Sequence, residues 1–117
     1  MKKFINNETL VDIMRSQKIF PVMRGKDGRK IIETAKEIHK GGLEIIEINI
    51  ETPEMFEVIE EVSSFMTVCA GGIITSFQAQ TACKSGAKVI SSPIFQPNLL
   101  KFSKSTQVPY IAGATTA

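Results

Sequence analysis

Glu47 is the residue whose type and surroundings most clearly suggest chemistry, because it interrupts the apolar stretch Leu43–Ile50. If this stretch is a strand, Ile46 and Ile48 face one side, and Glu47 and Asn49 face the other. A carboxylate surrounded by isoleucines is penalised in its charged form, so it is suited to general acid or base work near neutral pH. A structural carboxylate that a neighbouring amide or lysine satisfies fits the same position equally well.

Three further groups of candidate residues stand where apolar stretches end. Arg24 opens the loop Arg24-Gly25-Lys26-Asp27-Gly28 and could hold a carboxylate or phosphate, although a solvated loop arginine is the commoner case. Ala70-Gly71-Gly72 would let a ligand approach the backbone, but glycine also serves ordinary turns. Ser91-Ser92-Pro93 is a similar segment of small residues. In a parallel α/β fold these segments share the carboxyl edge of the sheet, where ligands bind.

The elements that would position these residues follow a regular alternation. Short apolar stretches recur roughly every 20–25 residues, with helical patterns between them. Such an alternation predicts a parallel sheet covered by helices, and hence the α/β class. Five strands could form a flavodoxin-like doubly wound domain or five of the eight strands of a barrel, and the pattern alone does not separate the two. The predicted strands are Ile19–Met23, Leu43–Ile50, Phe65–Ala70, Lys88–Ser91 and Pro109–Ala112.

Helices are predicted from apolar residues that recur at helical spacing. Residues 31–38 and 55–62 each carry such a stripe, which indicates one face packed on a sheet. Thr52 is expected to cap the second of these helices, with Pro53 at its first position. A leading helix at about residues 8–16 comes before the first strand.

The composition is that of a soluble globular protein. The chain has 117 residues, of which 43% are hydrophobic and 22% charged, and it predicts a single domain over residues 1–117. A net charge of +2 without a basic block makes nucleic acid an unexpected partner. No segment has the apolar length of a signal peptide or membrane span, which predicts a cytoplasmic protein with no membrane partner. Cys69, Cys83 and His39 share no metal-ligand spacing, so neither a metal nor a disulfide is expected.

Six short segments, taken in their order and spacing, are similar to a known family. They are Phe20-Pro21-Val22-Met23-Arg24, Gly41-Gly42-Leu43-Glu44-Ile45-Ile46-Glu47-Ile48, Ala70-Gly71-Gly72, Ser85-Gly86-Ala87, Ile90-Ser91-Ser92-Pro93 and Pro109-Tyr110-Ile111-Ala112-Gly113. Together they resemble the first five strands of the 2-keto-3-deoxy-6-phosphogluconate (KDPG) and 2-keto-4-hydroxyglutarate aldolases. The resemblance begins near Ile19 and covers the amino-terminal half of a family member.

The resemblance implies a fold, a reaction and a set of site residues. The fold would be a (β/α)₈ barrel, commonly a homotrimer, that cleaves a 2-keto-3-deoxy sugar acid phosphate to pyruvate and an aldehyde, glyceraldehyde 3-phosphate in the family. In this class I mechanism, which needs no cofactor, a lysine forms a Schiff base with the keto carbon and a glutamate moves protons through water. Glu47 matches that glutamate, and Arg24 matches an arginine that contacts the substrate in part of the family. Gly72, Ser92 and Pro93 fall at positions that line the pocket.

The chain also departs from the family pattern. Glu51 stands where many members carry an arginine for the substrate, Gly72 where they often carry threonine, and Ala112 where they carry proline. Glu51 would repel an anionic substrate unless its side chain turns away. The family's lysine strand and its glycine-rich phosphate-binding turns come after the position of Ala117, so we expect these 117 residues to be inactive by themselves.

Two other interpretations compete with the aldolase. One is another phosphate-binding barrel enzyme, such as a relative of thiamine phosphate synthase, because a fold does not determine a chemistry. The other is a flavodoxin-like regulatory module without catalysis. A module of the response-regulator kind needs clustered acids at the end of its first strand, and Met23-Arg24 stands there instead.

Overall fold

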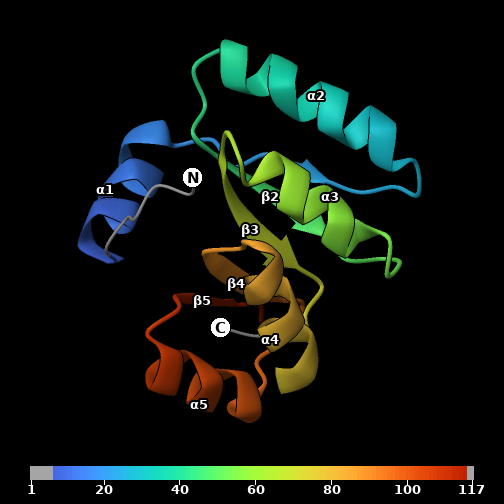
Figure 1. The fold of residues 1–117 in the computed structure, drawn as a ribbon. Coiled ribbons are helices and arrows are strands. Elements are labelled where there is room, and N and C mark those ends of the chain that lie inside the picture. Colours follow the sequence, from blue (N-terminus) through green and yellow to red (C-terminus); the bar gives the residue numbers. More distant parts are fainter. Residues whose placement is uncertain (1–6, 116–117) are drawn as a thin grey trace.

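A computed structural model describes residues 7–115, which form a parallel sheet whose strands alternate with helices (Figure 1). The strands form where isoleucine, valine and small residues are concentrated, because such side chains fit a sheet that is covered on its face. In chain order the elements are α1 (Asn7–Gln17), β1 (Val22–Met23), α2 (Gly28–Lys40), β2 (Ile45–Asn49), α3 (Met55–Val62), β3 (Thr67–Gly71), α4 (Ser76–Ser85), β4 (Val89–Ser92), α5 (Pro97–Thr106) and β5 (Tyr110–Ala112). The predicted α/β class and the five strand positions are confirmed.

The order of the strands separates the two folds that the sequence left open. The strands lie side by side as β1-β2-β3-β4-β5, and each neighbouring pair is parallel. A flavodoxin-like sheet has the order 2-1-3-4-5, whereas sequential order with a helix between successive strands is that of a (β/α)₈ barrel. The prediction of a partial barrel is therefore confirmed, and the flavodoxin-like alternative is wrong.

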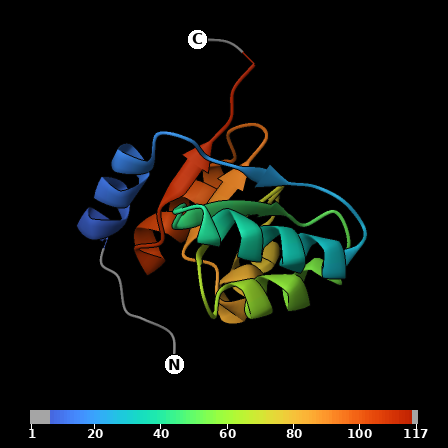
Figure 2. The ribbon, with the colours of Figure 1, turned by 90° about the horizontal axis from the view of Figure 1, so that it is seen from above.

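The two faces of the sheet are covered by different helices. Helices α2 to α5 follow one another along the outer face, each in contact with the next, while α1 lies apart from them (Figures 1 and 2). The outer face buries Ile46, Ile48, Val68, Ala70 and Ile90 in the main core. The opposite face, which we call the inner face, comprises residue 22 of β1, the alternate residues 45, 47 and 49 of β2, 67, 69 and 71 of β3, 89 and 91 of β4, and residue 111 of β5.

Helix α1 closes part of the inner face. Its Leu10 is 1% exposed and packs in a small cluster with Ile45, Cys69 and Val89. The side chain of Gln17 ties the end of the helix to the start of β2: its amide donates to the carbonyl of Ile45 at 2.8 Å, and its oxygen accepts from the backbone N–H groups of Glu44 and Ile45 at 2.8 and 3.0 Å. Nothing in the sequence pattern had singled out Gln17.

Helix boundaries follow local capping chemistry, with one error in the prediction. The predicted side-chain cap at Thr52 is wrong, because α3 begins at Met55 and residue 54 precedes it without a side-chain cap. Thr52 contributes its carbonyl instead, which accepts the N–H of Met55 at 3.0 Å, while its hydroxyl is buried without a hydrogen-bond partner among the described residues. Helix α4 starts with a full capping box between Thr75 and Gln78.

Candidate active site

Glu47 lies in the middle of the inner face, in a row of residues that the strand register brings together. Val22 of β1 pairs with Glu47, Glu47 with Cys69 of β3, and Cys69 with Val89 of β4. Cys69 and Val89 are fully buried, whereas Glu47 is only partly buried. The row therefore places one acidic side chain among apolar neighbours without sealing it from solvent.

The Glu47 carboxyl occupies space that a neighbouring glycine leaves free. A Cβ atom at Gly71 would lie 2.6 Å from Cδ of Glu47 and 2.9 Å from its Cγ, and closer still to Oε2. Any side chain at this position would collide with the carboxyl group. On the same strand, the Sγ atom of Cys69 donates a hydrogen bond to Oε1 of Glu47 at 3.7 Å. The carboxyl is thus held between a thiol and a bare Cα atom.

The Cys69 thiol is itself strongly perturbed by this arrangement. Burial raises its pKa well above the ordinary value of 9.0, and the charge of Glu47 and the hydrogen bond to it raise the pKa further. The neutral thiol is favoured because a thiolate would be both desolvated and next to a carboxylate. Cys69 is therefore a neutral hydrogen-bond donor and is not poised as a nucleophile.

Asn49, two residues nearer to the carboxyl edge of the sheet, also lies against a glycine. It pairs with Gly71, and a Cβ atom added at Gly72 would lie 2.9 Å from its Oδ1 atom. Gly72 has φ +75°, in the left-handed region that favours glycine. The glycine pair that the sequence suggested for close approach of a ligand thus makes room first for Glu47 and Asn49.

Arg24 lies at the same edge of the sheet. Because Met23 pairs with Ile48, the residue that follows β1 is aligned with Asn49. The Arg24 side chain is exposed, and the chain then turns at Gly25, whose φ is +149°. Among residues 7–115 the one ion pair joins Lys40 and Glu37, so the Arg24 guanidinium is not engaged in an ion pair with another described residue.

Ser92 is placed differently from the other candidate residues. It is 3% exposed and lies one residue out of phase with Val89 and Ser91, so its side chain belongs to the outer face. Its hydroxyl forms a short hydrogen bond with the Tyr110 hydroxyl and donates to the carbonyl of Ile94 at 2.6 Å. Pro93, which follows, is exposed at the strand end. The inner-face residue of this strand end is Ser91, which alternation from Val89 identifies.

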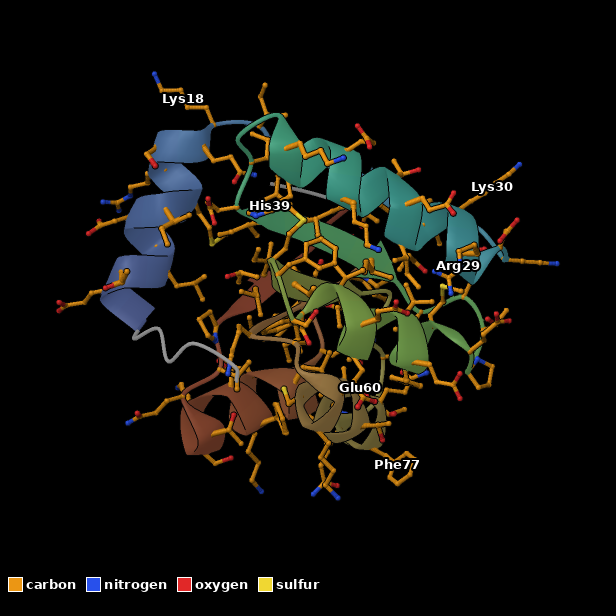
Figure 3. All side chains as sticks on the ribbon, turned by 45° about the horizontal axis from the view of Figure 1, so that its top comes forward. Lys18, Arg29, Lys30, His39, Glu60 and Phe77 are labelled. Carbon is orange, nitrogen blue, oxygen red and sulfur yellow. The ribbon has the colours of Figure 1, made fainter. Side chains whose placement is uncertain are left out.

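The described lysines lie outside the inner face. Lys18 and Lys30 point outward into solvent, as Figure 3 shows, and the other described lysines are exposed with one exception. The exception is Lys88, which is half-buried but precedes β4 and therefore lies at the edge opposite to Arg24 and Asn49.

Residues 7–115 contain neither a candidate metal site nor a candidate membrane-spanning helix. Within that range, no three histidine, cysteine, aspartate or glutamate side chains lie close enough together to hold a metal ion. Among the described helices, none has the length and apolar character needed to cross a membrane. His39, the one histidine (Figure 3), donates from Nδ1 to the carbonyl of Leu43 at 3.3 Å. Its ring also packs against the ring of Phe65.

Comparison with known families gives a match over nearly the whole chain. The family model for the KDPG and KHG aldolases matches residues 10–117. The 2-dehydro-3-deoxy-phosphogluconate aldolase of Treponema pallidum is 25% identical over 112 residues, which are 93% of this chain and 53% of the relative. The chain therefore spans about half the length of the curated relatives that it matches.

Solved structures show the same fold over the same extent. The KDPG aldolase of Zymomonas mobilis, solved with 3-phosphoglycerate, matches with a TM-score of 0.84 and 23% identity, over 92% of this chain and 53% of that one. The KDPG aldolase of Legionella pneumophila, solved with pyruvate captured as a covalent carbinolamine intermediate, matches with a TM-score of 0.79 and 23% identity, over 89% and 52%.

Proposed function

The chain belongs to the KDPG and KHG aldolase family, and from that premise we propose that it supplies the amino-terminal half of a class I aldolase. The reaction is the cleavage of a 2-keto-3-deoxy sugar acid phosphate to pyruvate and an aldehyde. The observation that carries the proposal is the Glu47 carboxyl, held on the inner face between Cys69 and Gly71. Proton transfer inside a barrel needs a side chain that can hold and release a proton there, and we propose the Glu47 carboxyl on the inner face for that role.

The proposed role of Glu47 follows from the proton balance of the reaction. When a lysine forms a Schiff base with the keto carbon, the resulting iminium accepts the electron pair of the breaking carbon–carbon bond. The hydroxyl that becomes the aldehyde must lose a proton, and the enamine left on the lysine must gain one. Glu47 can take the first proton through a water molecule and return it in the second step. Because Glu47 is only partly buried, a water molecule can reach its carboxyl and carry the proton.

The lysine of the mechanism is proposed to come from outside residues 1–117. A Schiff-base lysine needs a pKa lowered by burial or by a nearby positive charge. The described lysines are exposed apart from Lys88, which is half-buried at the wrong edge of the sheet. We therefore propose that the 117 residues alone do not catalyse the reaction.

The substrate contacts are proposed from the carboxyl edge of the sheet. Arg24 is suited to bind a carboxylate or phosphate, Gly72 makes room for Asn49 at this edge, and Pro93 is exposed at the end of β4. Ser92 would support this edge through its bonds to Tyr110 and Ile94, since its hydroxyl faces the other way. Pyruvate as one product is supported by the covalent pyruvate intermediate of the Legionella pneumophila enzyme.

The experiment that tests the proposal uses an extended protein. Residues 1–117 are joined to the second half of the Zymomonas mobilis aldolase, and pyruvate release is measured with KDPG as substrate. Glu47→Gln should lower kcat by about 10²–10⁴-fold, the usual contribution of general acid–base catalysis. Glu44→Gln is the matched control, because Glu44 is an exposed carboxylate that precedes the same strand.

Two outcomes would contradict the proposal. A folded extended protein that releases no pyruvate would remove the aldolase assignment. If the extended protein is active and Glu47→Gln lowers kcat as little as Glu44→Gln does, Glu47 does not transfer protons in the reaction.

A further inference from the structure

The contacts of the Glu47 carboxyl define its direction as well as its place. Oε1 accepts a hydrogen bond from Cys69 Sγ at 3.7 Å, while Oε2 lies over the Cα atom of Gly71. Gly71 is two residues nearer to the carboxyl edge than Cys69 and lies on the same face. The side chain therefore leans toward the edge at which ligands bind in this fold.

We propose that Cys69 is a positioning residue, whose S–H group anchors Oε1 of Glu47 so that Oε2 remains directed to the carboxyl edge of the sheet. The inference rests on the proposed function, because orientation of this carboxyl matters for catalysis only if Glu47 moves protons. It adds a residue to the site that neither the sequence pattern nor the match to the family identifies.

A thiol has physical properties that suit this role. It is a weak donor, so it orients the carboxylate without the strong stabilisation of the charged form that a lysine or arginine would give. Burial and the neighbouring carboxylate both raise the pKa of the thiol, so the S–H donor is present at neutral pH. Because the thiol stays neutral at neutral pH, it does not compete there for the protons that Glu47 exchanges.

The competing explanation is that Cys69 is only a small core residue. Buried cysteines commonly behave as apolar side chains, and Cys69 packs with Leu10, Ile45 and Val89. Two substitutions separate the explanations: Cys69→Ser keeps a donor of similar size, and Cys69→Ala keeps the small volume without the donor. A packing role predicts that alanine is tolerated at least as well as serine, whereas a positioning role predicts that serine is better.

The first test measures the hydrogen bond directly in the 117-residue chain. The chain has two cysteines, so in a Cys83→Ala background the infrared S–H stretching band belongs to Cys69 alone. We expect this band to move to higher frequency when Glu47 is replaced by glutamine and to move in the same direction when acid protonates Glu47. If the frequency of the band stays the same after both changes, the thiol does not donate to this carboxyl, and the proposal is overturned.

The second test measures the consequence in the extended protein. Cys69→Ala should lower kcat by about 10-fold with little change in KM, because a displaced proton-transfer group slows the chemical step. Cys69→Ser should restore kcat to within about 3-fold of the parent. If Glu47→Gln abolishes activity but Cys69→Ala and Cys69→Ser are both fully active, the proposed function stands and this inference fails. If Glu47→Gln itself is harmless, the proposed function fails first.

Discussion

Replacement of Gly71 by alanine is the most specific perturbation of the site, because it adds one methyl group against the Glu47 carboxyl. The new Cβ atom would lie 2.6 Å from Cδ and 2.9 Å from Cγ of Glu47. Gly71 is not among the glycines with positive φ, so alanine fits its backbone. The substitution therefore acts on the carboxyl and not on the fold of the strand.

The size of the effect follows from these distances. Carbon atoms in contact prefer separations of about 3.5–4.0 Å, so the carboxyl must withdraw by about 1 Å. Overpacking of this kind costs about 1–3 kcal/mol, and the lower end applies because the end of a glutamate side chain can rotate away. A displacement of about 1 Å at a catalytic group can cost about 10²-fold in rate. We therefore expect a small loss of stability together with a large loss of activity.

Both effects can be measured and compared with a matched substitution. Chemical unfolding of the Gly71→Ala chain should give a loss of about 1 kcal/mol, while kcat of the extended protein falls by about 100-fold. Gly41→Ala is the control: Gly41 ends α2 with φ −73°, and a Cβ atom there would approach only the carbonyls of Ile38 and Glu37, at 3.3 and 3.7 Å. Full activity in Gly71→Ala, or a stability loss of several kcal/mol, would refute the reasoning.

Three further predictions concern stability and assembly. Leu10→Ala should destabilise the chain by about 2–5 kcal/mol in urea unfolding, because Leu10 is buried against the inner face, and a loss below about 0.5 kcal/mol would show that α1 is not part of the core. The strand edges at β1 and β5, with Val22 46% and Ile111 38% exposed, should make the isolated chain self-associate, and a monodisperse monomer by light scattering would refute this. Because the pKa of Cys69 is raised in the folded state, its contribution to stability is complete below its ordinary pKa of 9.0 and is lost as the pH rises further. The free energy of unfolding of Cys69→Ala should therefore fall less than that of the parent between neutral and strongly alkaline pH. If the two free energies fall by the same amount, the burial of Cys69 does not cause the loss.

The positions of the strands could be predicted because each is a short apolar stretch set off by glycine, proline or a helical stripe. The placement of Glu47 on a face with Asn49 followed from simple alternation within one strand. These are local properties, and the chain encodes them within a few residues. The order of the strands is not local, and only the structure distinguished a barrel from a doubly wound sheet.

The details of the site depended on register between strands, which no single segment contains. Cys69 and Gly71 act on Glu47 only because β2 and β3 pair with residue 47 opposite residue 69. A shift by one residue would place other side chains against the carboxyl. The sequence predicts Ser92 at the pocket, yet its side chain lies on the outer face. Val89 packs on the inner face, and because side chains alternate along the strand, Ser92 faces the opposite side.

The measurement that tests the central claim most directly is the trapping of pyruvate with borohydride, read by mass spectrometry. A Schiff base between a lysine and pyruvate is reduced to a stable adduct, so each molecule with a competent lysine gains one pyruvate-derived mass. We expect no adduct on the 117-residue chain alone and one adduct on the extended protein. A stoichiometric adduct on the 117 residues would show that they contain the catalytic lysine, and a folded extended protein without an adduct would contradict the claim that this chain is half of a Schiff-base aldolase.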